Sequence, residues 1–342
     1  MTQNRITSDT ILLNENGEVA QPGYCELNRY IYSRSAIKAN ALRIKEWDFY
    51  QISDKRYTVQ MTFADISIGG AGCFTLFDRQ TGERLESMSL DLLTFGKLGL
   101  EENTNIPHFL KIKRGSFEMS VQVTPDKRIL FCRFKKGKDV YEADISMDIL
   151  PGLESLVMAV PFKQKKHFYL NQKTNCMPAV GFVAKNGQKI MEFDKQTAFC
   201  VLDWGRGVWP YSGSWYWGNG STRLDDGHIF GFEIGWGFGD MSNATENMLF
   251  YDGKGHKIEE IYLNKDEKDY MKPWEFTSND GRFNMTMTPL FDNYTSSRVL
   301  GIAGNKCHQV FGLWNGCAVL DDGTSIGVKD MIAFCEFSDN RW

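Results

Sequence analysis

The residues best suited to chemistry lie in one segment, Asp203–Asp240, which mixes aromatic rings, glycines and a few polar side chains. A few converging polar groups in an apolar cleft are the usual means of orienting a small ligand. Acid–base or donor chemistry could come from Asp203, Tyr211, Glu233 and Asp240. Ligand contacts by ring, amide or guanidinium could come from Arg206, Trp209, Trp215, Trp217, Asn219 and Trp236.

Five of the nine tryptophans fall in this segment. Each has roughly 150–250 Å² to bury, so five left in water would exceed the apolar area that a monomer normally exposes. They could fill a core between two sheets, or they could enclose a cavity. Glycines interleaved with the rings favour the cavity, because glycine inside a strand often marks a close backbone approach.

Glu233 is the one ionisable group on a strand face otherwise made of glycines and one isoleucine. If that face lines a cavity, burial raises the pKa of Glu233 and makes it a candidate general acid. A solvent-facing glutamate on an edge fits the alternation equally well. We expect Asp203 and Arg206 to pair with each other, and Asp240 to brace the loop that follows it.

The familiar catalytic and cofactor motifs are absent. The sequence has no dinucleotide fingerprint, no phosphate loop and no nucleophile elbow. Its five histidines are scattered, without ligand spacing, so we expect no metal and no cofactor. Its eight cysteines include no C-x-x-C, and we expect free, mostly buried thiols.

Strand signals dominate the chain, and only Ala36–Trp47 has a helical pattern, with Ser35 as its N-cap. Gly- and Asn/Asp-containing turns recur at short spacing. Many short strands at regular spacing are typical of antiparallel barrels or sandwiches. The clearest period-two runs are Tyr57–Phe63, Phe117–Val123, Ile129–Phe134 and Phe283–Met287.

The chain contains an internal repeat. Val183–Cys200 and Val319–Cys335 each predict a strand, an Asn/Asp-Gly turn, a second strand, and a strand ending in Ala-Phe-Cys. Duplication into two tandem β domains is the simplest explanation. We expect domain one at residues 1–205 and domain two at residues 206–342, with the ligand site near their junction.

The overall composition limits the class of partner. The 342 residues have a net charge of −4, and no basic stripe is present, so nucleic acid is not an expected partner. No stretch is long and apolar enough to span a membrane, and the start lacks an export signal. We expect a soluble, cytoplasmic protein whose partner is a small molecule. The sequence does not predict the oligomeric state.

Specific motifs carry a family resemblance over nearly the whole chain. D-W-G-R-G-V-W-P-Y at 203–211, W-Y-W-G at 215–218, G-W-G-F-G-D at 235–240 and T-E-N at 245–247 resemble a bacterial and fungal family of domains of unknown function. That family is similar in layout to two-domain lipocalin-like carotenoid hydratases and fungal Diels–Alderases. The resemblance implies two calycin-type barrels and an apolar pocket near their contact. It brings no established catalytic residue, and relatives often have asparagine at the position of Glu233.

These indications predict an all-β protein of two tandem lipocalin-like antiparallel β-barrels. It would bind a small, largely apolar or polycyclic molecule in a Trp-rich pocket, with cofactor-independent hydratase, cyclase or isomerase chemistry. A carbohydrate-active enzyme with paired carboxylates is one alternative, and an open groove would favour it. A non-catalytic carrier is another, favoured by a pocket with no ionisable group near the ligand.

Overall fold

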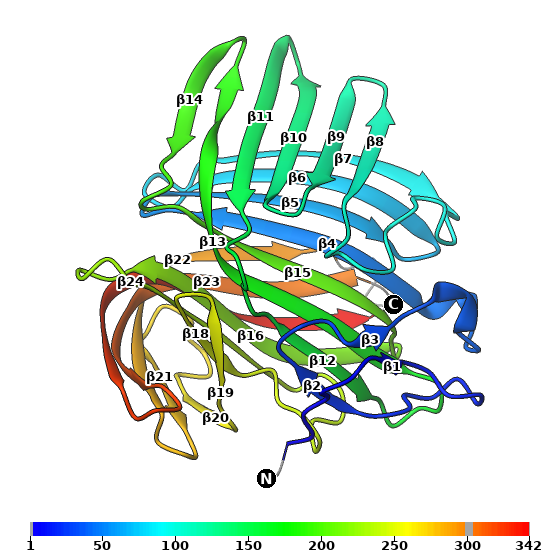
Figure 1. The fold of residues 1–342 in the computed structure, drawn as a ribbon. Coiled ribbons are helices and arrows are strands. Elements are labelled where there is room, and N and C mark those ends of the chain that lie inside the picture. The colour runs from blue at the N-terminus through cyan, green and yellow to red at the C-terminus, as the bar shows by residue number, and fades with distance from the viewer. Residues whose placement is uncertain (1–2, 298–303, 342) are drawn as a thin grey trace.

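The computed structural model describes residues 3–297 and 304–341, and antiparallel β-sheet makes up nearly all of its regular structure. Ten strands of the first sheet form one path that curls into a nearly closed barrel (Figure 1). From edge to edge they are β7 (Arg84–Leu92), β6 (Gly69–Asp78), β5 (Tyr57–Asp65), β4 (Ile44–Ser53), β15 (Phe199–Val208), β13 (Phe168–Lys185), β11 (Asp139–Asp148), β10 (Lys127–Lys136), β9 (Phe117–Val123) and β8 (His108–Arg114).

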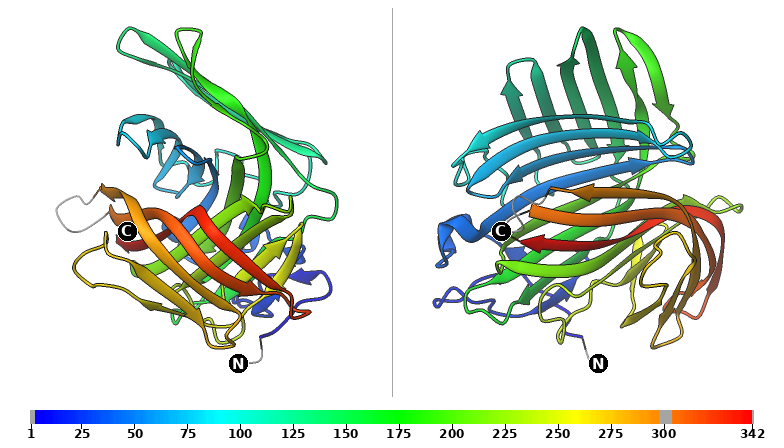
Figure 2. Two further views of the ribbon diagram at one scale, coloured as in Figure 1. Left: turned by 90° about the vertical axis from the view of Figure 1, so that its left-hand side faces the viewer. Right: turned by 180° about the vertical axis from the view of Figure 1, so that it is seen from behind.

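A second sheet of nine strands forms a half-barrel that lies against the first (Figure 2). The prediction of an all-β fold built from two antiparallel units is confirmed, and the second unit is an open half-barrel. Its strands, in order, are β19 (Lys254–Lys257), β18 (Met248–Tyr251), β17 (Ile229–Trp236), β16 (Ser212–Arg223), β24 (Ser325–Arg341), β23 (Gly304–Val319), β22 (Phe283–Ser296), β21 (Trp274–Ser278) and β20 (Ile261–Asn264). The chain changes sheet between β15 and β16.

Short elements complete the fold. β12 (Leu156–Pro161) pairs with β13 on one side and with β2 (Gly23–Cys25) on the other. β14 (Gln188–Phe193) pairs with the C-terminal end of β13. β1 (Thr10–Ile11) and β3 (Tyr30–Ile31) form a separate parallel pair.

The helix predicted at Ala36–Trp47 is wrong. Two 3-10 turns, η1 (Arg34–Ala36) and η2 (Ala41–Arg43), flank an extended stretch, and β4 begins at Ile44. β4 pairs with β5 on one side and with β15 on the other, so sheet pairing overrides the local helical pattern.

Both copies of the repeat form antiparallel hairpins, with one difference. The first copy turns at Asn186–Gly187 and the second at Asp322–Gly323, and in each the returning strand pairs with the strand before it. In the first copy a turn at Asp194–Thr197 separates β14 from β15, and Phe199-Cys200 opens β15. In the second copy Ala-Phe-Cys lies inside β24, so the prediction that this motif ends a strand is wrong in both copies. In the second copy β24 runs through without a break.

Side-chain alternation gives β15 and β17 one face toward a barrel core and one face toward the layer between the sheets. Along β15, Cys200, Leu202 and Trp204 enter the core of the first barrel. Along β17, Phe232 and Ile234 enter the core of the half-barrel. The opposite faces of these strands meet across the interlayer, and their residues can therefore act together.

Gly205 shows how closely that layer is packed. A Cβ atom added to Gly205 would lie 1.9 Å from Cζ2 of Trp47. We therefore expect Gly205→Ala to displace the Trp47 ring and to lower the free energy of unfolding by about 1–3 kcal/mol, measured by urea denaturation. Gly327→Ala in β24 is the control, because nothing lies within 4 Å of its added Cβ. Equal stability of the two variants would contradict this packing.

Candidate functional site

A cavity of about 290 Å³ lies in the layer between the sheets. This volume is close to the lower end of typical small-molecule pockets. The cavity receives side chains from β4, β5, β7, β13 and β15 of the first sheet and from β16, β22, β23 and β24 of the second. Its aromatic wall consists of Trp47, Phe49, Tyr169, Trp209, Trp215, Trp217 and Phe238.

The rings of this wall hold one another in place. Phe238 contacts Trp209 and Trp215 edge to face, with ring centroids 4.6 and 4.8 Å apart. Trp47 contacts Trp209 at 5.0 Å and stacks on Tyr169 at 6.1 Å. Edge-to-face contacts of this kind fix ring orientation, so the wall has a defined shape before any ligand arrives.

Not all the crowded tryptophans reach the cavity. Trp204 points into the first barrel, where it is fully buried. Trp236 stacks on Tyr216, with centroids 5.0 Å apart, beside the core of the half-barrel. Alternation explains both, since each lies on the barrel-facing side of its strand. Of the four predicted tryptophan ligands, the structure therefore brings Trp209, Trp215 and Trp217 together and leaves Trp236 apart.

A buried lysine lies at the base of the cavity. Lys173 on β13 contacts Asp203 Oδ1 at 3.2 Å and Glu246 Oε1 at 3.4 Å, and its ammonium lies 3.8 Å from the centroid of the Trp217 ring. Asn171 Nδ2 also donates to Asp203, at 2.6 Å. Burial alone would lower the pKa of Lys173, but Asp203, Glu246 and Glu233 outweigh it and raise that pKa. The lysine is therefore held as a cation.

Glu246 is the second carboxyl of this cluster. It accepts a hydrogen bond from the Tyr169 hydroxyl at 3.3 Å, and burial raises its pKa although Lys173 opposes the shift. A Cβ atom on Gly235 would lie 2.6 Å from Glu246 Oε2. The glycine in β17 thus lets the Glu246 segment approach the sheet.

Glu233 is fully buried, but it does not line the cavity. It lies behind Trp217, whose Nε1 donates to Glu233 Oε1, and Asn219 Nδ2 donates to Oε2 at 2.9 Å. Burial raises its pKa well above the usual value, with Lys173 opposing. The glycine-rich face around it is filled by neighbouring chain, since a Cβ on Gly231 would lie 2.4 Å from Cys176 Sγ. Glu233 is thus placed to support the wall.

Glu336 is the carboxyl that faces the cavity from the second sheet. It lies on β24 and is 8% exposed. Trp215 Nε1 donates to Oε1 at 3.2 Å, and Gln309 Nε2 donates to Oε2 at 3.4 Å. Burial raises the pKa of Glu336 to about 7, against the opposing effects of Lys173 and the Trp215 hydrogen bond. A carboxyl with this pKa can both give and take a proton near neutrality.

Three of the predicted site residues lie away from the cavity. Arg206 points into the first barrel, where it pairs with Asp48 Oδ1 at 2.9 Å. The predicted Asp203–Arg206 pair is therefore wrong, because alternation along β15 sends the two side chains to opposite faces. Tyr211 is 45% exposed, beneath the Arg43 guanidinium. Asp240 is exposed, and its carboxylate accepts a bond from the Ser242 backbone within the loop that it was expected to brace.

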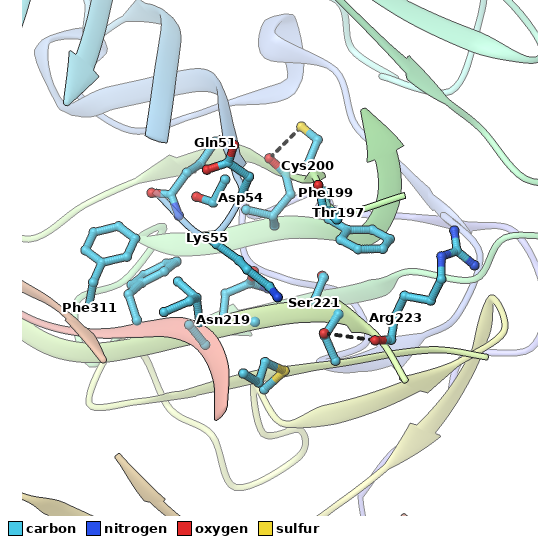
Figure 3. A pocket seen from close by; sticks show the side chains of 18 of the residues that line it. Gln51, Asp54, Lys55, Thr197, Phe199, Cys200, Asn219, Ser221, Arg223 and Phe311 are labelled. Carbon is cyan, nitrogen blue, oxygen red and sulfur yellow. Dashed lines mark hydrogen bonds between the residues drawn. The ribbon is translucent and has the colours of Figure 1, made fainter. Parts of the chain in front are cut away.

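Asn219 lines a second interlayer cavity, of about 260 Å³. Figure 3 shows Gln51 on β4 and Lys55 in the turn after β4 pointing into it, opposite Asn219 and Ser221 on β16. Phe311, Phe334 and Trp217 pack together between the two cavities. Asn219 does not line the Trp-rich cavity, and it bonds to Glu233, which in turn accepts from Trp217.

Sequence reasoning missed Lys173, Glu246, Glu336, Trp47 and Tyr169. Two of them had a usable signal. Glu246 lies in the T-E-N motif, and Glu336 directly follows the Ala-Phe-Cys of the second repeat. In the first repeat the matching position is Val201, so a carboxyl replaces an apolar residue on an interlayer face. Lys173 had no local signal, because its role depends on the pairing of β13 with β15.

The cysteine prediction is confirmed. All eight cysteines are free, and five of them are buried, including the repeat-related Cys200 and Cys335. Among residues 3–297 and 304–341, no group of three or more His, Cys, Asp or Glu side chains could hold a metal ion. No helix of the described chain has the length and apolarity to cross a membrane.

The chain belongs to the family described as a domain of unknown function, DUF2804, whose model matches residues 3–342. No curated protein matches the chain. Two solved structures are similar to it in overall trace. One is an AttH-like protein from Nitrosomonas europaea, at 12% identity and a TM-score of 0.47 over 90% of this chain and 95% of that one.

The other is kievitone hydratase from Nectria haematococca, at 10% identity and a TM-score of 0.47 over 91% of this chain and 93% of that one. These similarities are too low for the chemistry of either protein to be carried over. The function of this chain therefore has to be argued from its own residues.

Proposed function

We propose that the Trp-walled cavity binds a small, largely apolar, flat molecule and that Glu336 transfers a proton to or from it. The observation that carries the proposal is a buried carboxyl with a pKa of about 7 facing an aromatic cavity. An acid is most effective when its pKa lies near the working pH. The nearby Lys173–Asp203–Glu246 cluster supplies preorganised charge without a cofactor.

Hydration of a carbon–carbon double bond is the reaction that suits these groups best. Glu336 on the second sheet would give its proton to one alkene carbon. Asp203 on the first sheet would take a proton from water while the water oxygen bonds to the other carbon. The π bond breaks, one C–H and one C–O bond form, and solvent returns the proton from Asp203 to Glu336.

Different surroundings for the two carboxyls support this division of roles. Asp203 accepts bonds from Asn171 and from the Lys173 cation, whereas Glu336 faces the rings and bonds to the neutral side chains of Trp215, Gln309 and Cys307. Pairs of carboxyls in contrasting environments are typical of acid–base sites. Ionisable groups along the cavity also weigh against a purely non-catalytic carrier.

Binding can be tested before the substrate is known. We expect 2-naphthol, a flat bicyclic probe, to bind saturably in isothermal titration calorimetry. Trp215→Ala should weaken its affinity by roughly two- to tenfold, because an aromatic contact is lost. Trp236→Phe is the control and should bind as the wild type does, since Trp236 lies beside the other core. Equal affinity of all three proteins would place the probe elsewhere and contradict the proposed site.

The natural ligand can be sought by native mass spectrometry of protein purified from its own cells. A co-purifying unsaturated molecule that the protein converts to its hydrate would support the proposal. A bound molecule that stays chemically unchanged on the wild-type protein would support the carrier instead.

A further inference from the structure

The first barrel contains a buried arginine that has no carboxylate partner. Arg128 on β10 is 2% exposed. Within the described chain its guanidinium donates only to neutral oxygens, at 2.9 Å to Thr104 Oγ1, 2.9 Å to the Thr104 carbonyl and 3.3 Å to the Tyr50 hydroxyl. Its Nε–H is buried without an acceptor in the described chain. An unpaired buried charge is costly, so this arrangement calls for a counter-ion.

Two acids inside the same barrel, Asp48 and Glu46, already form ion pairs with other arginines. Asp48 pairs with Arg206, and Glu46 pairs with Arg34 while accepting from the Tyr32 hydroxyl at 2.7 Å. None of the described carboxylates forms an ion pair with Arg128. Arg128 therefore has no ion-pair partner within the described part of the barrel.

Arg128 lines a cavity of about 480 Å³, separate from the two interlayer cavities. A second donor on this cavity, Asn28 Nδ2, is also buried without an acceptor in the described residues. Two carboxylates lie on the cavity lining. Glu26 is paired with Arg5 at 3.0 Å, and the exposed Asp126 accepts from Thr124 Oγ1 at 2.8 Å. The buried donors therefore face no buried acid.

The rest of the wall carries no charge. Its apolar part is formed by Leu27, Pro125, Ile149, Leu150, Pro151 and Leu153, and its neutral polar part by Asn105, Thr124, Ser155, Gln172 and Thr174. A cationic end and an apolar body together match an organic carboxylate with a hydrocarbon chain or ring, since arginine binds carboxylates by charge-assisted hydrogen bonds. A bare inorganic oxyanion would leave the apolar wall without a partner.

We propose that this cavity is a second ligand site, for an apolar monocarboxylic acid, with Arg128 as the counter-charge of the carboxylate. The site is independent of the Trp-walled cavity and of its proposed chemistry.

Octanoate is the probe for the test, and urea denaturation is the measurement. We expect octanoate to raise the urea midpoint of the wild-type protein, because a ligand that binds only the folded state stabilises it. Octan-1-ol, with the same chain and no charge, and inorganic phosphate should have little effect. Arg128→Met should weaken octanoate binding by about tenfold or more and, without octanoate, should be at least as stable as the wild type.

Two matched variants keep the result interpretable. Leu150→Trp should fill the cavity and abolish the octanoate effect while leaving Arg128 in place. Trp215→Ala, in the other site, should leave the effect intact. The proposal is overturned if octanoate gives no stabilisation, if octan-1-ol or phosphate matches it, or if Arg128→Met responds as strongly as the wild type. It is also overturned if Arg128→Met alone strongly destabilises the protein, because the arginine would then be structural.

Discussion

Replacing Lys173 by methionine is expected to lower the free energy of unfolding by about 3–5 kcal/mol at neutral pH, because it removes the cation from a buried cluster of carboxylates. Lys173 is 3% exposed in its side chain and contacts both Asp203 and Glu246. It also opposes the raised pKa of Glu233. Methionine keeps the length of the side chain, so the loss reports on charge rather than on packing.

The loss should depend on pH in a defined direction. The pKa values of Glu246 and Glu233 are raised in the fold, so the folded state holds protons that the unfolded chain has released. Their contribution to stability is therefore lost as pH rises. Without Lys173 the pKa values of Glu246 and Glu233 rise further. The substitution should therefore lower the free energy of unfolding more at pH 8 than at pH 6.

Urea denaturation of the wild type and the variant at both pH values measures this effect. Lys189→Met is the matched control, since Lys189 forms an exposed pair with Glu192, and it should change stability little. A Lys173→Met protein as stable as the wild type at pH 8 would show that the cluster is not charged as described.

Glu336→Gln is expected to lower kcat by about 10²- to 10⁴-fold on the natural substrate, with a smaller change in KM. Glutamine keeps the shape and can still accept from Trp215, but it cannot give a proton. The pH–rate profile of the wild type should show a limb near pH 7, and the variant should lack that limb. Steady-state kinetics across pH 5–9 would measure both effects.

Two variants separate this role from general disturbance of the site. Asp240→Asn should keep full activity, because Asp240 is exposed and bonded within its own loop. Glu233→Gln should reduce activity less than Glu336→Gln, because Glu233 lies behind Trp217 and does not line the cavity. If Glu233→Gln has the larger effect, the acid has been assigned to the wrong residue.

The strands and the repeat could be predicted because alternation and Asn/Asp-Gly turns act locally. The same alternation correctly set Glu233 opposite Phe232 and Ile234. It could not show which face of β17 meets another sheet, and so whether Glu233 lies in water, in a cavity or against β13. The packing of Asn175 and Cys176 of β13 against β17 decided that question.

The polar residues of the site could not be predicted from the sequence, for a different reason. Lys173 and Asp203 meet because β13 pairs with β15, and Glu336 joins them only when β24 of the other sheet packs against this pair. The aromatic part could be found because Trp209, Trp215 and Trp217 are close in sequence. Arg206 shows the limit of proximity, since it is three residues from Asp203 but lies on the opposite face of the same strand.

The titration of the Glu336 carboxyl tests the proposed acid role most directly. Carbon-13 NMR of protein labelled at glutamate side-chain carboxyls, compared with Glu336→Gln to assign the signal, gives its titration curve. We predict a midpoint near pH 7 for Glu336, against the usual 4.5. A midpoint at the usual value would mean that the carboxylate is already ionised at neutral pH, and it would contradict its role as the acid of this site.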